Sequence, residues 1–212
     1  MRKERASTDP GLQELQRRRE KWLAHCRRFG ALGYDRLCSV RFVLDCAPDL
    51  QGPALDVGTG KGLCAVELAT RGLEVVSIDP DAEEQALAKL LAEEAPEAGN
   101  IRFLQGDAAS LPFPEASFGS AVILDALHHL KYSRPVLEEM VRVVRSAGTI
   151  LLADFDETGF ALVAKVQAEE GRVHGRTEVT VDGAGAELFA LGCRQVLRTR
   201  GALHEILVVQ KP

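Results

Sequence analysis

The chain has 212 residues, of which 46% are hydrophobic and 27% charged, with a formal net charge of −5. This length suits one well-buried domain and is short for two. No apolar run approaches the roughly 18 residues that a membrane span requires, and the five scattered cysteines form no Cys-x-x-Cys pair. A disulfide framework, a zinc knuckle and a membrane partner are therefore not expected. The N-terminus lacks the apolar core of a secretory signal, so we expect a cytoplasmic protein.

Charge is unevenly distributed along the chain. Residues 1–30 contain nine Lys or Arg and four Asp or Glu, so the remainder is strongly acidic. The basic segment is interpreted either as a patch for nucleic acid or an acidic partner, or as the solvated face of an amphipathic helix docked on the body. We favour the helix, because an acidic body repels a phosphate backbone. Nucleic acid is therefore not expected as a partner.

Hydrophobic periodicity predicts alternating helices and strands. Two helices come first, over about residues 12–29 and 34–46. Seven strand-like apolar runs follow, at residues 54–58, 74–79, 101–106, 120–125, 149–155, 193–200 and 204–211. Further helices are predicted between them, at residues 62–71, 81–95, 133–146 with a Ser133 cap, and about 158–170.

The order of these elements indicates an α/β fold with a doubly wound, mainly parallel seven-stranded sheet. Only a short turn at Gly201–Ala202 separates the last two strands, whereas a parallel crossover needs about a dozen residues. These strands must form an antiparallel C-terminal hairpin, which a plain dinucleotide-binding sheet lacks. We divide the chain into an N-terminal helical segment at 1–48, packed on the core, and a main domain at 49–212.

A glycine-rich turn follows the first strand, in the sequence ALDVGTGKGLC at residues 54–64. A phosphate-binding P-loop would require Gly where Leu55 stands and Ser or Thr where Gly62 follows Lys61. A dinucleotide fingerprint would require Gly where Leu63 stands. Both patterns fail. Instead, Asp56 lies two residues before the first glycine, where a carboxylate would repel a pyrophosphate but accept hydrogen bonds from an amino group, directly or through water.

The glycine amides and the N-terminus of the next helix would in turn face a carboxylate, so a zwitterionic amino acid fits this turn. With this pattern, residues 56–62 resemble the first motif of the class I S-adenosylmethionine-dependent methyltransferases. The resemblance covers about residues 50–155, and the family shares the strand order ending in a hairpin. The turn Ser146-Ala147-Gly148 departs from it, since many members have Lys or Arg, Pro, Gly and Gly there.

The resemblance implies S-adenosyl-L-methionine as the cofactor and a set of residues around it. Asp79, which ends the second strand, is implied to accept the ribose hydroxyls, and Asp107 to receive the adenine amino group with the Ala108 amide nearby. Asp125 ends the fourth strand, and the resemblance implies that it lies beneath the sulfonium. The predicted cofactor-binding residues are Asp56, Gly58, Thr59, Gly60, Asp79, Pro80, Asp107, Ala108 and Asp125.

Methyl transfer from a sulfonium needs alignment more than acid or base chemistry. Where the nucleophile is a hydroxyl or thiol a base helps, and His128 and His129 follow Asp125 at the ligand-binding edge of the sheet. They are the candidate catalytic residues, with His128 slightly favoured; alternatively one of them packs or caps the following helix and the other is solvated. A metal site is not expected, because the spacing resembles no known ligand pattern.

Other polar residues occupy the same edge. Asp154, Asp156 and Glu157 follow the fifth strand and either orient the acceptor or, as we prefer, cap the next helix. Tyr34 and His174 lie in segments that could cover the site. The resemblance implies a methyltransferase acting by in-line displacement on an unidentified small-molecule acceptor. Two alternatives stay open: a non-catalytic accessory protein of this fold, and an RNA or protein methyltransferase that docks through the basic arm.

Overall fold

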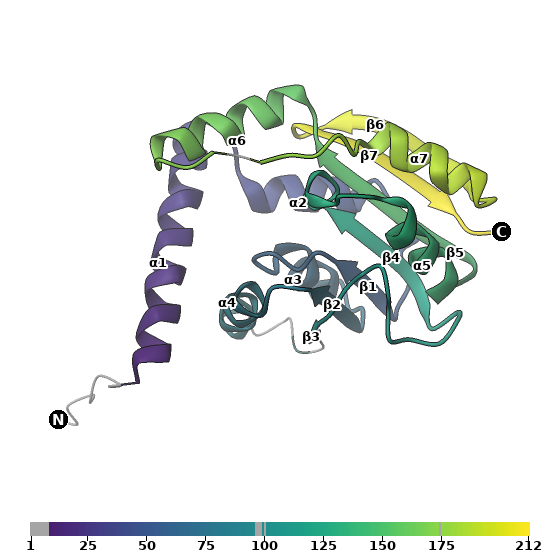
Figure 1. Cartoon of the computed structure of the whole chain (residues 1–212), viewed down its shortest axis with the longest axis horizontal. Helices are drawn as coiled ribbons and strands as arrows, with labels where there is room; N and C mark the ends of the chain where they lie inside the picture. Colours follow the sequence, from purple (N-terminus) through teal and green to yellow (C-terminus); the bar gives the residue numbers. More distant parts are fainter. Residues whose placement is uncertain (1–8, 96–98, 100, 174) are drawn as a thin grey trace.

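The computed structural model describes residues 9–95, 99, 101–173 and 175–212. Its centre is a seven-stranded sheet in the order β3-β2-β1-β4-β5-β7-β6 (Figure 1). The first five strands pair in parallel, and β7 runs antiparallel to both β5 and β6. The predicted doubly wound sheet with a C-terminal hairpin is confirmed. The strands are β1 Ala54–Val57, β2 Val75–Asp79, β3 Ile101–Gln105, β4 Phe118–Leu124, β5 Val144–Phe155, β6 Arg194–Gly201 and β7 His204–Gln210.

Helices cover both faces of the sheet and continue beyond one of its edges. They are α1 Pro10–Ala31, α2 Arg36–Asp45, α3 Leu63–Thr70, α4 Ala82–Glu93, α5 Arg134–Val143, α6 Glu157–Glu169 and α7 Val181–Ala190, with a 3₁₀ turn, η1, at Leu127–His129. Five α-helices begin at a side chain that accepts a backbone N–H, the usual N-cap interaction. These N-caps are Asp9, Asp35, Asp81, Asp156 and Thr180.

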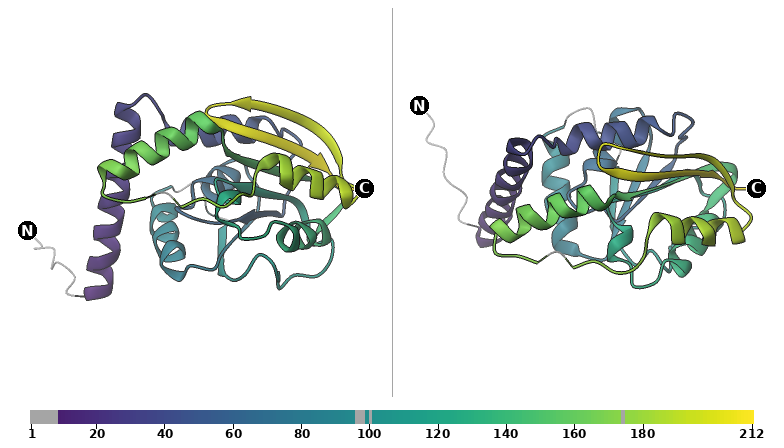
Figure 2. Two further views of the ribbon diagram at one scale, coloured as in Figure 1. Left: turned by 45° about the horizontal axis from the view of Figure 1, so that its top comes forward. Right: turned by 90° about the horizontal axis from the view of Figure 1, so that it is seen from above.

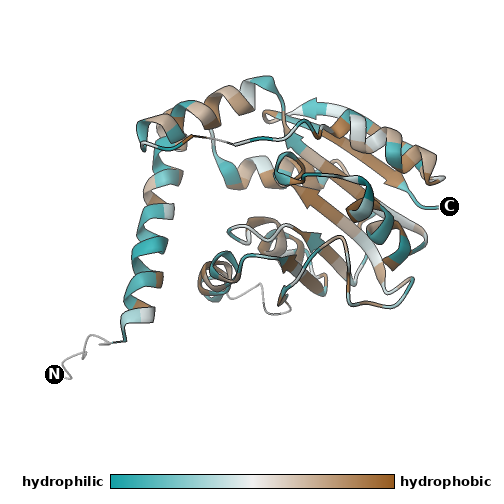
Figure 3. Ribbon diagram, in the orientation of Figure 1, coloured by the Kyte–Doolittle hydropathy of each residue, from teal (hydrophilic) through white to brown (hydrophobic). Residues whose placement is uncertain are grey.

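The core has two layers separated by the sheet. One layer contains apolar side chains of α5 and α7, and the other contains those of α2 and α3. Successive side chains of β5 point to opposite faces of the sheet. Ile150 and Leu152 therefore pack in the first layer, and Leu151 and Ala153 in the second. Strand β4 is buried at every position, as expected of a central parallel strand. Figure 3 shows the contrast between the hydrophobic central strands and the largely hydrophilic α1.

The N-terminal helices extend the fold beyond the sheet. Helix α1 contacts α4 and α6, and α2 packs on α3 (Figure 2). Within the described residues, no helix combines the length and the apolar character that crossing a bilayer would demand. The boundary between residues 48 and 49 stays a prediction. Residues 1–8 of the basic arm and His174 lie outside the described residues.

Two predicted elements were wrong in detail. The helix predicted over 133–146 ends at Val143, because Val144 is fully buried and pairs with Phe118 at the start of β5. Ser133 does not cap this helix; its hydroxyl instead donates to Glu187, at 2.7 Å.

Helix α7 was not predicted, since glycines at positions 183 and 185 disfavour a helix. Packing supplies the reason for one of them: a Cβ on Gly185 would lie 2.7 Å from Leu207, so glycine allows α7 to approach the sheet closely.

Candidate functional site

The glycine turn joins β1 to α3 at the carboxyl edge of the sheet. Gly58, Gly60 and Gly62 have φ values of 86°, 48° and 77°, a left-handed conformation in which other residues are strained. Gly58 is also required by close packing, because a Cβ there would lie 2.5 Å from the Cβ of Ala126. The turn therefore brings the backbone at the end of β1 against the residue that follows Asp125.

Asp56 is the buried acid of this turn, with 1% of its surface exposed. The Ser77 hydroxyl donates to Asp56 Oδ2 at 2.7 Å, so Ser77 must accept its hydrogen bond from Thr59, at 2.6 Å. Gln85 donates to Thr59 in turn, at 2.8 Å. Burial raises the pKa of Asp56 to about 6 despite the Ser77 bond. The other oxygen, Oδ1, is buried without an N–H or O–H partner within the described residues.

Asp79 connects the glycine turn to the next loop. One of its oxygens accepts the Gly60 N–H at 3.1 Å and the other accepts the Asp81 N–H at 2.9 Å. Its carbonyl accepts the Gly106 N–H at 3.0 Å, which places Asp107 beside it. The Asp107 carboxylate is exposed and accepts the Ala109 N–H at 2.8 Å. A backbone hydrogen bond thus holds side by side the two loops that carry these predicted carboxylates.

Pro80 and Ala108 follow these two carboxylates. Gln105 donates through its side chain to the Pro80 carbonyl, at 3.1 Å. Ala108 is half-buried and packs against the core layer under α5 and α7.

The two candidate catalytic histidines have different environments. His128 is buried, and its Nδ1 lies 2.7 Å from Oδ1 of Asp154. Because a carboxylate only accepts, Nδ1 carries the proton, and Nε2 is the basic nitrogen of the neutral ring. Asp154 also accepts the His128 backbone N–H, at 2.8 Å. His129 is more exposed, with its ring centre 4.0 Å from that of His128. Partial burial of its imidazole, together with the neighbouring His128, lowers the pKa of His129.

Residues of β5 and α6 cover His128. The Phe160 ring stands edge-on to the imidazole at 5.2 Å, and Phe155 lies at 6.3 Å. The Thr177 N–H donates to the His128 carbonyl at 2.8 Å, which ties the segment after α6 to η1. The preferred capping interpretation is confirmed for Asp156, whose side chain accepts the Gly159 N–H.

Asp125 forms a second carboxylate–histidine pair. It has a φ of 57° and turns one oxygen toward Nε2 of His204, 2.6 Å away. Nδ1 of the same ring lies 2.8 Å from the Ala202 carbonyl. The Ser39 hydroxyl, 3.1 Å from Nδ1, itself donates to that carbonyl. Both ring nitrogens therefore donate, and His204 is an imidazolium. Burial would raise the pKa of Asp125 and lower that of His204, but their attraction outweighs burial and shifts both pKa values in the opposite directions.

The N-terminal segment lines the same side of the molecule. Trp22, Phe29 and Tyr34 are buried, and burial raises the pKa of Tyr34 to about 12. The Tyr34 ring lies 6.4 Å from that of Phe155, on β5. Arg36 follows with its guanidinium near the Trp22 ring. The first residues of α2 therefore reach the strand ends.

The residues present fit the cofactor that the motif implies. Asp56 Oδ1 is a buried acceptor that needs a donor, as an amino group provides. Each oxygen of Asp79 accepts one backbone N–H and retains a lone pair for a hydroxyl. Asp125 differs, since both of its oxygens already face cations.

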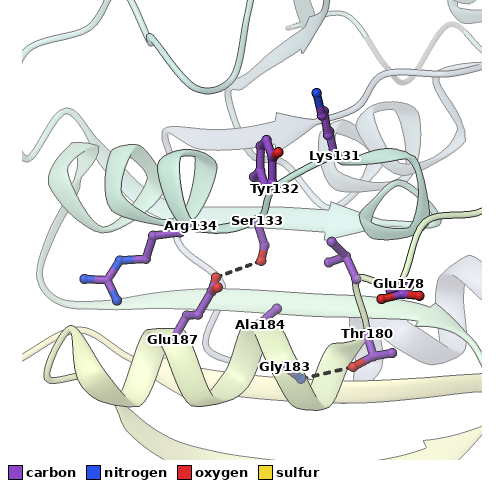
Figure 4. A pocket seen from close by; sticks show the side chains of 10 residues that line it. Lys131, Tyr132, Ser133, Arg134, Glu178, Thr180, Gly183, Ala184 and Glu187 are labelled. Atoms are coloured by element: carbon purple, nitrogen blue, oxygen red, sulfur yellow. Dashed lines mark hydrogen bonds between the residues drawn. The ribbon is translucent and has the colours of Figure 1, made fainter.

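A separate hollow of about 330 Å³ lies between α5 and α7 (Figure 4). It contains none of the predicted site residues. Its lining includes the Ser133–Glu187 hydrogen bond and the Thr180 cap of α7. The lining residues are Lys131, Tyr132, Ser133, Arg134, Glu178, Val179, Thr180, Gly183, Ala184 and Glu187.

Two site residues were missed by sequence reasoning. His204 lies at the start of the last strand and Arg36 at the start of α2, far along the chain from the motif. A polar residue beginning an apolar strand was a signal for His204. Arg36 offered no signal beyond its position two residues after Tyr34.

Comparison with known proteins supports the same interpretation. Residues 55–152 match the model of the "Methyltransferase domain" family. The "uncharacterized methyltransferase YcgJ" of Bacillus subtilis is 36% identical over 100 residues, covering 47% of this chain and 39% of YcgJ. A "demethylmenaquinone methyltransferase" of Beutenbergia cavernae is 33% identical over 132 residues, covering 62% of this chain and 52% of that protein. The chain thus spans about half, or less, of the length of these relatives.

A solved structure shows the same fold. The crystal structure of the PH0226 protein from Pyrococcus horikoshii superposes with a TM-score of 0.70 over 84% of this chain and 90% of that one. The identity is 17%, so this likeness concerns the fold.

Proposed function

Because this chain belongs to the class I methyltransferases, with the matched domain at residues 55–152, we propose that it binds S-adenosyl-L-methionine and methylates a small-molecule acceptor. The observation that carries the proposal is the joint geometry of Asp56, Asp79 and the glycine turn. It offers acceptors for an amino group and for hydroxyls at one sheet edge. These residues, with Thr59, Pro80, Asp107, Ala108 and Asp125, stay the proposed cofactor site.

The reaction proposed is an in-line displacement. The bound cofactor supplies an activated methyl group, whose bond to sulfur breaks as the acceptor atom bonds to carbon. The chain contributes alignment, which is worth up to roughly 7–11 kcal/mol in well-oriented reactions. The close contact of Gly58 with Ala126 and the hydrogen bonds of Asp79 make this edge rigid. A rigid site keeps the acceptor atom, the methyl group and the sulfur in line.

His128 is proposed as the base for a hydroxyl or thiol acceptor. The Asp154 carboxylate holds the proton on Nδ1 and orients the ring, so Nε2 can take the proton that the acceptor loses. His129 is more accessible than His128, and its ring lies beside the His128 ring, with 4.0 Å between the ring centres. We propose it as a residue that contacts the acceptor.

A small molecule is the proposed acceptor. The demethylmenaquinone methyltransferase, by its name, acts on such a molecule. Two arginines of the basic segment form ion pairs with α4 and the residue after it: Arg18 with Glu83 and Glu84, and Arg19 with Glu94 in a two-pronged pair at 2.5 and 2.9 Å. Cations paired in this way do not favour docking of nucleic acid. The cytoplasmic location expected from the sequence stays a prediction.

Calorimetric titration of the protein tests the proposal. S-adenosylmethionine and S-adenosylhomocysteine should bind, and NAD should not. A screen of small hydroxylated acceptors with labelled methyl donor should then return product whose formation requires His128. Absence of binding by both sulfur compounds would refute the proposed function.

A further inference from the structure

Arg36 is a cation enclosed by aromatic rings at the start of α2. Its guanidinium carbon lies 5.3 Å from the ring centres of both Trp22 and Phe29 and 5.9 Å from that of Phe155. Its side chain is 19% exposed. Such contacts offset part of the cost of removing the charge from water. They involve the faces of the aromatic rings, however, and provide no acceptors for the N–H donors of the guanidinium.

The donors of Arg36 are incompletely used. Nε is buried and has no hydrogen-bond partner in the described structure. Nη2 approaches Oδ2 of Asp125 at 3.5 Å, which is long for a hydrogen bond. The imidazolium of His204 already holds the other oxygen of Asp125, at 2.6 Å. Two cations therefore share one carboxylate, and a buried guanidinium donor is left over. A leftover donor of this kind is costly unless a ligand accepts from it.

The position of Arg36 indicates which ligand group this is. Arg36 approaches Asp125, and the next residue, Ala126, packs against Gly58 of the glycine turn. Lys61 of that turn has its ammonium 5.9 Å from the ring of Trp22, the same ring that Arg36 contacts. Lys61 is itself paired with Glu84, whereas Arg36, which shares the Trp22 ring with it, keeps a buried donor without a hydrogen-bond partner in the described structure. A planar guanidinium suits a carboxylate best, because the two can form paired hydrogen bonds.

We propose that Arg36 binds a carboxylate of a ligand seated at the glycine turn. This rests on the proposed function. Two sources offer the same chemistry: the amino-acid end of the cofactor and a carboxylate on the acceptor. In either case α2 contributes a specificity residue to the site. Helix α1 contributes indirectly, because the rings of its Trp22 and Phe29 hold the guanidinium in place.

The test compares binding of matched ligands by calorimetry. S-adenosylhomocysteine carries the carboxylate, whereas 5′-methylthioadenosine lacks the amino-acid end and retains the nucleoside. If the cofactor is the source, Arg36→Gln should weaken S-adenosylhomocysteine binding at least tenfold and leave 5′-methylthioadenosine within about twofold. Arg36→Lys, which keeps the charge without the fork, should be intermediate. Arg71→Gln, which removes an arginine paired with Asp45 and Glu67, is the matched control and should change neither.

If the acceptor is the source, both nucleosides bind Arg36→Gln normally. The protein saturated with S-adenosylhomocysteine is then titrated with 4-hydroxybenzoate and with its methyl ester as probes. The acid should bind the wild type at least tenfold more tightly than the ester, and the substitution should abolish that preference. Normal nucleoside binding together with no acid preference overturns the inference. Failure of both nucleosides to bind the wild type would instead refute the proposed function, and with it this inference.

Discussion

Replacing Asp56 by Asn should change the pH dependence of folding stability. Burial raises the pKa of Asp56 from its ordinary 3.8 to about 6. Between these values the unfolded chain loses the proton while the folded chain keeps it, so wild-type stability falls as pH rises. Each pKa unit is worth about 1.4 kcal/mol, so the loss amounts to about 1 kcal/mol at pH 4.5 and about 3 kcal/mol at pH 7.5.

Urea unfolding of both proteins at several pH values measures this difference. All other titratable groups are common to both proteins, so the difference in unfolding free energy isolates Asp56. Asp56→Asn adds a constant offset through the Ser77 hydrogen bond, but its stability relative to wild type should rise by about 2 kcal/mol from pH 4.5 to 7.5. If the difference in unfolding free energy between the two proteins stays constant from pH 4.5 to 7.5, the conclusion that burial raises the pKa of Asp56 is refuted. An amino group bound at Oδ1 should favour ionisation, so S-adenosylhomocysteine affinity should fall on acidification through pH 6 in the wild type alone.

Three further changes test the rest of the site. Asp79→Ala should weaken S-adenosylhomocysteine binding at least tenfold by calorimetry, because the change also frees the Gly60 amide; unchanged affinity would remove Asp79 from the site. His128→Ala should lower turnover about 10²–10⁴-fold for a hydroxyl acceptor with cofactor affinity unchanged, and turnover at the wild-type rate would exclude it as the base. Gly58→Ala should cost about 2 kcal/mol or more in urea unfolding, since strain and the Ala126 contact add. Gly72→Ala, at a φ of 84° with open space around it, is the matched control and should cost less.

The sequence predicted helices and strands correctly where the local preference of a segment agrees with its packing in the fold. Apolar runs bounded by Gly and Pro marked the strands, and the short turn before His204 required an antiparallel hairpin. Helix α7 was missed because its glycines serve packing against Leu207, which no local pattern reveals. The predicted end of α5 was wrong for a related reason, since burial in the sheet outweighs helical preference at Val144.

The sequence predicted site residues only where they belong to one continuous set of motifs. Asp56, Asp79 and the glycines follow each other at fixed spacing along the chain. Arg36 and His204 act on Asp125 from residues 89 positions before and 79 positions after it. Contacts over such separations depend on the strand order, so single-sequence reasoning had no basis for selecting these two residues.

The strand ends also explain why two buried carboxylate–histidine pairs differ in chemistry. Strand register places Leu124 beside Ala153 and Phe155 beside His204, so Asp125, Asp154 and His204 lie at one level. His204 faces the Ala202 carbonyl as well as Asp125, so both of its nitrogens must donate and it has no lone pair for a proton. His128 donates to Asp154 through Nδ1 and keeps a basic Nε2 in its neutral form. Base chemistry is therefore proposed for the pair that joins η1 to β5, whereas the pair on β7 holds Asp125 ionised beside Arg36.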